Sequence, residues 1–372
     1  VATVPLLLNV FAPRAVLKLR HRMRAWVLPE VKTHLTPPRP DDERAAATEG
    51  LFAGFSIDEM ANRVGTLLEN IGLVDRMAPL VVILGHDSAS ANNPHIAAYS
   101  CGACGGRSGG PNARLFARMA NLPDVRALLR TRGIHIPDST LFIGGVHDTC
   151  TDQITLYDEA VPAARTADLT AAVARFDVAR ALNAQERCRR FISADPDISA
   201  PDAIDHVERR SADLGQARPE LGHATNASCI VGRRHLSQGT FLDRRAFLVS
   251  YDPTLDRDGS IIERILNAVG PVGAGINLEY FFSTVDNERL GAGTKLPHNV
   301  TSLLGVMNGA CSDLRTGLPK QMIEIHEPVR LQLILEARLD HVARVLERQP
   351  AIAELVQHEW VCVSTIDPDT GA

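Results

Sequence analysis

The chain has 372 residues, of which 45% are hydrophobic and 22% are charged, a composition typical of globular proteins that bury a core. Its net charge of -5 argues against the basic surface of a nucleic-acid-binding protein, so we expect no nucleic-acid partner. No segment approaches the roughly 20 consecutive apolar residues that a membrane-spanning helix needs.

Residues 1–55 are predicted to form a helical and linker segment that ends in a proline-rich, charged stretch. The chain begins with Val1 rather than methionine, and we expect that an N-terminal portion precedes it. Ser56 and Glu59 then form the pattern of a capping box, in which each side chain accepts a hydrogen bond from the backbone of the other residue. Apolar residues at helical spacing continue this helix to about Gly72.

Two short apolar runs, 79–86 and 140–147, are predicted to be buried strands of a parallel sheet, because they are apolar on both faces. Helices are expected between them over 113–120 and 124–132. This alternation favours an α/β fold, a parallel sheet with flanking helices whose functional groups lie at the carboxyl ends of the strands. We assign residues 56–165 to this α/β core.

Two further regions follow the core. Residues 166–217 are predicted to be a helical insertion, and residues 218–372 a mixed α/β C-terminal region with many glycines. The elements expected in these two regions are helices over 167–193, 201–211 and 261–269, a strand over 241–250, and mostly helix over 331–356 with an interruption at Pro350.

A histidine and a cysteine flank the polar, glycine-rich loop that follows the first predicted strand. His86 ends that strand, and Cys101 comes fifteen positions later as the first residue of a Cys-x-x-Cys motif that ends at Cys104. Imidazole and thiolate are ligands that zinc prefers, and a position at a strand end directs both into one cleft. The glycines allow the loop to fold tightly around a site. These residues therefore indicate a metal site.

The spacing of Cys101 and Cys104 leaves other interpretations open. Such a pair also occurs in thiol redox centres and as inert buried cysteines. The chain has seven cysteines over its whole length, which is unlike a small disulfide-rich secreted domain and fits a reducing, cytoplasmic setting. His147 and Asp148 end the second predicted strand, where they either line the same cleft or form ordinary hydrogen bonds of the loop.

Several long segments resemble the C-terminal half of the DabA family of inorganic carbon transporter subunits. The resemblance is carried by GHDSASANNPHIAAYSCGACGGRSGGPNAR, HATNASCIVGRRHLSQGTFLDRRAFLVSYDPT and GTKLPHNVTSLLGVMNGACSDLRTGLPKQM, and it extends from about Phe52 to the end of the chain. It implies a peripheral subunit on the cytoplasmic face of the bacterial inner membrane, in an energy-coupled pump for CO2 or bicarbonate. It also implies a membrane-embedded DabB-type partner, related to the ion-translocating subunits of respiratory complex I.

The resemblance further implies a Zn2+ site and a sheet similar to those of β-carbonic anhydrases. The site of the family has two Cys, one His and one Asp as ligands. The His ligand of the family falls on His86 and its second Cys ligand on Cys101, which makes Cys104 a neighbour. Asp87, Ser88 and Ser90 are candidates to orient these ligands from nearby, and Cys104, His147 and Asp148 are possible further neighbours.

The sequence departs from the family in one respect. The first Cys ligand and the Asp of the family come from an upstream Cys-x-Asp-x-Arg strand, which is not found in these 372 residues. We therefore expect that the N-terminal half of the family fold, with the catalytic Asp–Arg pair, is absent from this chain and is either lost or supplied by a separate chain. Two other functions stay open, a thiol oxidoreductase that uses Cys101 and Cys104, and a non-catalytic assembly subunit stabilised by zinc.

Overall fold

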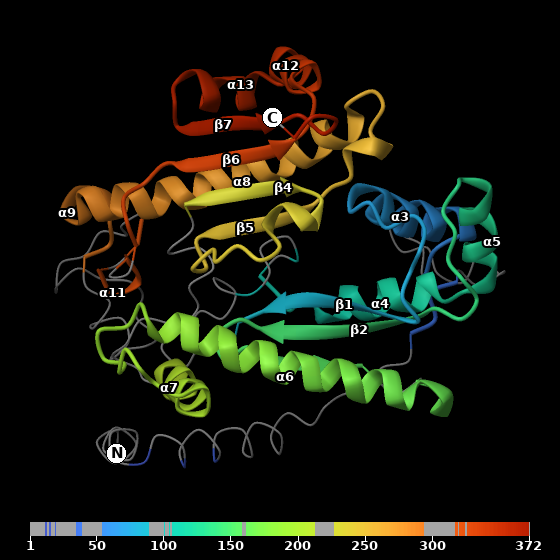
Figure 1. Ribbon diagram of the computed structural model, residues 1–372, viewed down its shortest axis with the longest axis horizontal. Coiled ribbons are helices and arrows are strands. Elements are labelled where there is room, and N and C mark those ends of the chain that lie inside the picture. The colour runs from blue at the N-terminus through green and yellow to red at the C-terminus, as the bar shows by residue number, and fades with distance from the viewer. Residues whose placement is uncertain are drawn as a thin grey trace, which may run out of the picture. The chain divides into compact units, whose positions relative to one another are not determined.

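The computed structural model describes residues 12, 15, 19, 35–38, 54–88, 100, 104, 106–157, 161–212, 227–293, 317–318, 320–323 and 326–371. Its helices are α3 (Ile57–Asn70), α4 (Gly110–Ala120), α5 (Pro123–Thr131), α6 (Thr166–Cys188), α7 (Ala200–Ala212), α8 (Ser260–Val285), α9 (Asn287–Leu290), α11 (Lys320–Ile323), α12 (Leu339–Arg348) and α13 (Pro350–Gln357) (Figure 1). Its strands are β1 (Leu80–Asp87), β2 (Leu141–Asp148), β3 (Gln153–Leu156), β4 (Ser228–Gly232), β5 (Ala246–Ser250), β6 (Leu331–Glu336) and β7 (Val361–Ile366). The chain divides into two compact units, the first made of Val1–Thr66, Val74–Cys188 and Ala194–Pro219, and the second of Leu67–Leu73, Arg189–Ser193 and Glu220–Ala372.

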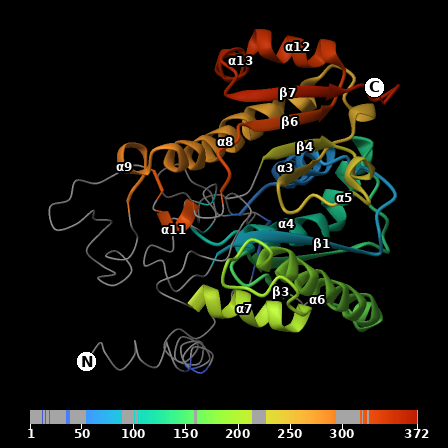
Figure 2. The same ribbon diagram turned by 60° about the vertical axis from the view of Figure 1, so that its left-hand side comes forward.

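The first unit contains a three-stranded sheet in the order β1-β2-β3. β1 and β2 are parallel, from the pair Leu80 and Leu141 to the pair Asp87 and Asp148, whereas β3 runs antiparallel to β2. α4 packs against β1 and β2, and α6 packs against α7, as the turned view shows (Figure 2). The predicted succession of strand, helices and parallel strand is therefore confirmed.

Local sequence signals explain how several of these elements begin and pack. The backbone N–H of Ser56 donates to Glu59 Oε2 at 2.8 Å, and the N–H of Glu59 donates to Ser56 Oγ at 3.1 Å, which confirms the predicted capping box. A β-carbon on Gly144 of β2 would lie 2.5 Å from the Cα of Arg114, so the absence of a side chain lets α4 approach the strand closely.

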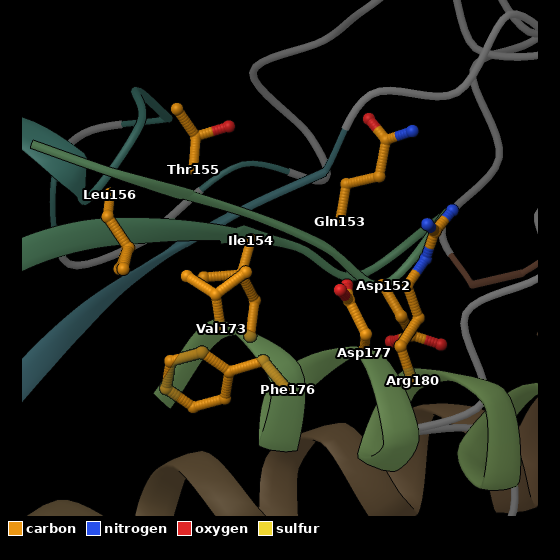
Figure 3. A pocket seen from close by; sticks show the side chains of 9 residues that line it. All are labelled: Asp152, Gln153, Ile154, Thr155, Leu156, Val173, Phe176, Asp177 and Arg180. Atoms are coloured by element: carbon orange, nitrogen blue, oxygen red, sulfur yellow. The ribbon is translucent and has the colours of Figure 1, made fainter. Parts of the chain in front are cut away.

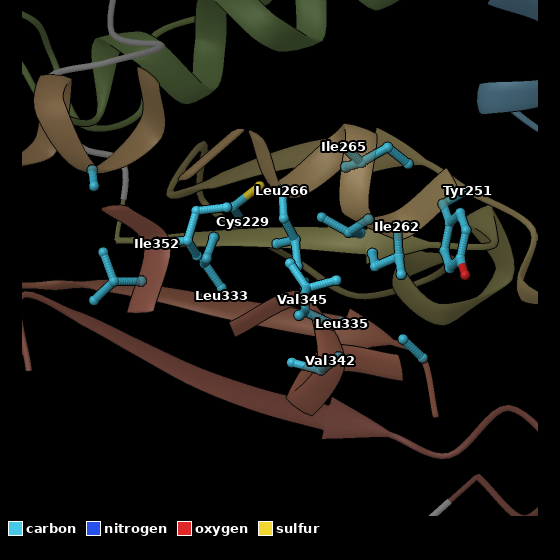
Figure 4. Packing of buried hydrophobic residues seen from close by; sticks show 14 of the residues in the cluster. Cys229, Tyr251, Ile262, Ile265, Leu266, Leu333, Leu335, Val342, Val345 and Ile352 are labelled. Carbon is cyan, nitrogen blue, oxygen red and sulfur yellow. The ribbon is translucent and has the colours of Figure 1, made fainter. Parts of the chain in front are cut away.

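The second unit contains a four-stranded parallel sheet in the order β5-β4-β6-β7. Alternate residues of its strands point to one face, where they form the main hydrophobic core with α8, α12 and α13 (Figure 4). Burial of these side chains removes apolar surface from water and is the principal stabilising contribution in this unit. The labelled members of the core are Cys229, Tyr251, Ile262, Ile265, Leu266, Leu333, Leu335, Val342, Val345 and Ile352.

The prediction of helix at the start of 331–356 was wrong, because β6 occupies the first six residues. Leu331, Leu333 and Leu335 are buried, and their spacing of two places all three on the core face of the sheet. The remainder of the range does form two helices, α12 and α13, and the second begins at Pro350 as expected.

Other predictions in the second unit had the right type but the wrong length. The strand predicted over 241–250 is confined to its second half as β5, and the helix predicted over 261–269 continues to Val285 as α8. α8 passes through Pro271, which normally ends or kinks a helix. A β-carbon on Gly273, two residues later, would lie 3.2 Å from Leu331 Cδ2, so this part of the helix packs closely against β6.

The α/β fold class and the parallel sheet with flanking helices are thus confirmed. None of the helices in the described residues is long and apolar enough to cross a membrane. Most of the segment 1–55 lies outside the described residues, and the division of the chain into four regions stays a prediction. The likeness to the β-carbonic anhydrase sheet also stays a prediction.

Candidate functional site

Four of the predicted site residues lie together at the carboxyl ends of β1 and β2, which form one end of the sheet. His86 pairs in register with His147, and Asp87 pairs with Asp148. Two imidazoles and two carboxylates therefore lie on adjacent strands at the end where α/β proteins most often carry their functional groups. Cys101 and Ser90 lie outside the described residues, so their predicted positions beside this edge stay predictions.

Asp87 connects the strand end to the loop that follows it. Its Oδ1 accepts hydrogen bonds from the backbone N–H of Ser88 at 2.8 Å and from the hydroxyl of Ser100 at 2.9 Å. Its carbonyl accepts from the backbone N–H of Thr149 at 3.0 Å. Ser100, the neighbour of Cys101 in the chain, is therefore hydrogen-bonded to Asp87, the neighbour of His86.

The loop also returns to β1 just before α4. The backbone N–H of Gly109 donates to the carbonyl of His86 at 2.7 Å. A β-carbon on Gly85 would clash with the backbone of Gly109, and one on Gly109 would lie 2.9 Å from the N of His86. Two glycines therefore let the backbones of the loop and of β1 touch at this point, whereas most of the loop lies outside the described residues.

His147 is held by a network of charged and polar groups that sequence reasoning did not identify. Its Nε2 lies 3.0 Å from Oδ1 of Asp152, whose second oxygen accepts from Arg187 Nη1 at 2.5 Å and from Asn183 Nδ2 at 2.6 Å. Arg187 is fully buried and Asp152 is 4% exposed. A buried carboxylate with these partners fixes the orientation of the imidazole.

The turn between β2 and β3 is fastened to α6 at several points. Arg187 Nη2 also donates to the carbonyl of Cys150 at 3.3 Å, and Arg180 Nε donates to the carbonyl of Thr151 at 3.1 Å. Asp148 stabilises the same turn, since its Oδ1 accepts from the N–H of Cys150 and its Oδ2 from the hydroxyl of Thr151. The carboxylate of Asp148 thus serves the loop hydrogen bonding that was one of its two predicted roles.

Ser88 and Cys104 have contacts that bear on their predicted roles as neighbours of the site. Ser88 is 1% exposed, and its Oγ lies 3.0 Å from Sγ of the buried Cys150. The Sγ of Cys104 accepts a hydrogen bond from Asn112 Nδ2 at 3.2 Å. The chain offered no signal for Cys150, because a single buried cysteine resembles any small apolar residue.

Within the described ranges, no group of three or more His, Cys, Asp or Glu side chains is arranged to hold a metal ion. His86 is the one predicted zinc ligand that these ranges include. Its imidazole suits zinc, and the loop beside it leads to the thiol of Cys101, so the available donors fit part of a zinc site.

Two cavities border the sheet among the described residues of the first unit. One, of about 190 Å³, separates β3 from α6 and has the aliphatic and aromatic side chains of Ile154, Val173 and Phe176 at one end and Asp152, Asp177 and Arg180 at the other (Figure 3). The other, of about 320 Å³, lies beside α4 and β2, where Arg114 and Arg118 contribute to its wall. No predicted site residue lines either cavity, although Asp152 connects the first to His147.

Polar groups of the second unit form ion pairs. Glu336 is 1% exposed and accepts hydrogen bonds from the backbone N–H of Arg233 at 2.7 Å and from its Nε at 2.8 Å. Arg190 pairs with Asp243 at 2.5 Å and with Glu327 at 3.5 Å. These carboxylates are neutralised within the fold, which fits a structural role.

Comparison with known proteins identifies the family. Residues 1–361 match the family model described as "Probable inorganic carbon transporter subunit DabA". A "Probable inorganic carbon transporter subunit DabA 1" of Sorangium cellulosum is 58% identical over 370 residues, which are 99% of this chain and 36% of that protein. A DabA protein of Methylococcus capsulatus is 53% identical over 369 residues, which are 99% of this chain and 34% of that protein.

The match is long in this chain but partial in its relatives. The chain spans about a third of the length of the curated relatives that it matches. No solved structure matches the chain. The family model and the relatives nevertheless agree, and this chain belongs to the DabA family.

Proposed function

We propose that this chain is part of a subunit that hydrates CO2 to bicarbonate in an inorganic carbon pump, at a Zn2+ centre to which it contributes His86 and Cys101. Family membership and the position of His86 at a strand end support the proposal. The observation that carries it is the hydrogen bond from Ser100 to Asp87, because it draws the residue before Cys101 toward the end of β1.

The remaining ligands of such a centre, a Cys and an Asp, would come from residues outside this chain. Zinc would supply the chemistry, because it lowers the pKa of water to about 7 in carbonic anhydrases and so provides a nucleophile for CO2 at neutral pH. The residues of this chain position that chemistry. Gly109 fixes the backbone of His86, and Asp87 holds the loop. The Asp152–Arg187 pair keeps the imidazole of His147 in one orientation at the same edge.

The wider setting is also a proposal. We infer a peripheral position on the cytoplasmic face of the bacterial inner membrane and a membrane-embedded DabB-type partner, whose cation flux favours hydration. The names of the relatives, which are called transporter subunits, support a partner. Bicarbonate uptake by cells that express both subunits should fall when an ionophore collapses the ion gradient. Uptake that is indifferent to the ionophore would reject the coupling.

Zinc analysis tests the centre directly. We define the chimera as the Sorangium cellulosum relative in which this chain replaces the region that it matches. Plasma mass spectrometry of the purified chimera should find about one zinc per molecule, and His86→Ala should remove most of it. His135 is exposed and lies on another loop, so His135→Ala is the matched control and should retain zinc. Stoichiometric zinc in the isolated 372-residue chain would show that the ligand set is wrong, and its loss in Cys104→Ala would then identify Cys104 as a ligand.

One observation favours the alternative of a thiol oxidoreductase. The Asn112 amide donates to the sulfur of Cys104, and a hydrogen bond of this kind stabilises a thiolate. If this alternative holds, mild oxidation should form a disulfide between Cys101 and Cys104, which peptide mass spectrometry detects. A zinc centre that only stabilises the fold would instead show four protein ligands and no water in X-ray absorption spectra.

A further inference from the structure

The cavity of about 190 Å³ between β3 and α6 has an apolar wall along most of its length. Ile154 and Leu156 of β3 point toward α6, and Val173 and Phe176 of α6 point back toward the strand (Figure 3). Val173 is 41% exposed although it lines the cavity, so part of this apolar wall stays in contact with solvent. Entry of an apolar group that displaces water from the wall is therefore favourable.

The other end of the cavity carries charged side chains. Asp152, Asp177 and Arg180 lie together there (Figure 3). The positive charge of Arg180 is already balanced, because its Nη2 lies 2.6 Å from Oε1 of Glu208. Its Nε donates to the carbonyl of Thr151 at 3.1 Å, which fixes the guanidinium against the turn between β2 and β3. Arg180 therefore does not neutralise the two carboxylates beside it.

The two carboxylates differ in whether the fold neutralises them. Asp152 is 4% exposed, and Arg187 balances its charge at 2.5 Å. Asp177 is exposed, and no ion pair in the described part of the chain includes it. The polar end of the cavity thus keeps one net negative charge, that of Asp177, next to an apolar wall.

Size and charge together limit what this cavity accepts. Pockets for drug-sized ligands measure about 300–1,000 Å³, so a volume of about 190 Å³ suits a single short chain. A positive group at Asp177 with an aliphatic stem along the wall uses both halves of the cavity. An anion of the same length meets the repulsion of Asp177, and an uncharged chain gains nothing from the carboxylate.

We infer that this cavity binds a guanidinium or ammonium group on an unbranched aliphatic stem, with the cation at Asp177 and the stem between β3 and α6. This chemistry belongs to the arginine and lysine side chains of another polypeptide and also to free alkyl amines. The inference does not depend on the zinc centre, since His86 does not line the cavity.

Titration of this chain with n-butylguanidinium, followed by amide chemical shifts in NMR, tests the inference. The amides of 153–156 and 173–180 should shift, with a dissociation constant of about 1–10 mM for so small a compound. 1-Butanol and butyrate have the same stem and should bind at least about threefold more weakly, because they lack the positive charge. Equal binding of the three compounds, or shifts that avoid β3 and α6, overturns the inference.

A capped pentapeptide with a central arginine distinguishes the two sources of the cation. Peptide binding at least as tight as that of n-butylguanidinium identifies the side chain of another polypeptide as the occupant. A peptide that does not bind, while n-butylguanidinium does, identifies a free alkyl cation instead. Failure of both compounds to bind refutes the site.

Two pairs of variants on α6 test the two halves of the cavity separately. Asp177→Asn should weaken binding of n-butylguanidinium by about threefold and leave that of 1-butanol unchanged. Glu186→Gln makes the same change of charge on this helix outside the cavity and should alter neither. Val173→Trp should fill the cavity and abolish binding, whereas Val178→Trp, at a position that is 61% exposed and outside the cavity, should preserve it.

The outcomes separate this inference from the proposed zinc centre. Unchanged binding of n-butylguanidinium in Asp177→Asn rejects the carboxylate as its partner, and unchanged binding in Val173→Trp rejects the cavity as its site. Either result leaves the zinc content of the chimera untouched. A chimera without zinc, in turn, leaves the binding of alkyl cations by this chain unaffected.

Discussion

The two sheets carry different side chains at the carboxyl ends of their strands. In the second unit, Arg233 directly follows β4 and Glu336 ends β6; these two side chains neutralise each other, and the strands pack against a large apolar core. In the first unit, β1 and β2 end in histidines and aspartates, and the buried ion pair between Asp152 and Arg187 holds one of them, His147. The second sheet therefore depends chiefly on apolar burial, whereas the end of the first sheet depends on buried charge and hydrogen bonds.

The largest effect is expected when the buried carboxylate of Asp152 loses the arginine that pairs with it. Arg187→Met leaves Asp152 without its main partner inside the fold, and the free energy of unfolding should fall by about 3–5 kcal/mol. Urea unfolding followed by circular dichroism measures this change. Arg175→Met, on an exposed position of the same helix, should change it by less than about 0.5 kcal/mol. Adding Asp152→Asn to Arg187→Met should recover part of the loss, and a double variant as unstable as the single one would mean that charge is not the cause.

A core truncation should be nearly as costly in the second unit. Leu333 is 1% exposed on the central strand β6, and Leu333→Ala should lower the free energy of unfolding by about 2–5 kcal/mol, because it removes apolar contacts and leaves a cavity. Leu339, which is 70% exposed, provides the control Leu339→Ala with little expected change. Similar losses for the two variants would contradict the assignment of the core.

A smaller effect is expected at the edge of β2. The side-chain amide of Asn121 satisfies both backbone groups of Phe142 there. Its Nδ2 donates to the carbonyl of Phe142 at 2.8 Å, and its Oδ1 accepts from the N–H of Phe142 at 3.0 Å. Asn121→Ala should cost about 1–3 kcal/mol of unfolding free energy, because it leaves both backbone groups unpaired. It should also accelerate exchange of the Phe142 amide. Unchanged exchange at Phe142 would show that water replaces the amide without loss.

The smallest effect at neutral pH concerns the thiol in the core of the second unit. Burial raises the pKa of Cys229 to about 11 from an ordinary value of 9.0. The folded state therefore favours the neutral thiol, and its contribution to stability is complete below about pH 9 and is lost as the pH rises through about 11. The difference in unfolding free energy between the original chain and Cys229→Ala should be constant from pH 6 to 8, on the scale of these pKa values. It should shrink above about pH 9, and a difference that stays constant to pH 11 would contradict the burial of this thiol.

Much of the first unit could be predicted from the sequence because its signals are local. The apolar runs 79–86 and 140–147 predict β1 and β2, and the capping box at Ser56 predicts the start of α3. His86 could be placed at a strand end because it closes the first of these apolar runs. In the second unit, β4 and β7 were missed and β6 was taken for helix, because short apolar runs have no helical or extended signature of sufficient length.

The supports of the site could not be predicted, because they depend on contacts between distant residues. Arg187 lies 35 positions from Asp152 along the chain and looks like any arginine of an Ala/Arg-rich helix. The bond from Ser100 to Asp87 likewise joins a loop to a strand end, and no spacing rule indicates it. The sequence could propose His86 and His147 as candidate site residues, whereas the groups that hydrogen-bond to them follow only from the three-dimensional structure.

The backbone contact between Gly85 and Gly109 also limits which sequences this fold accepts. A methyl group at Gly85 would collide with another backbone, which cannot turn aside as a flexible side chain can. At Gly133 a new methyl group would meet no atom within 4 Å, and only the φ of 85° would disfavour it. In a library of random variants the first position should therefore tolerate no replacement, and the second should admit asparagine and aspartate, which accept that backbone angle most readily.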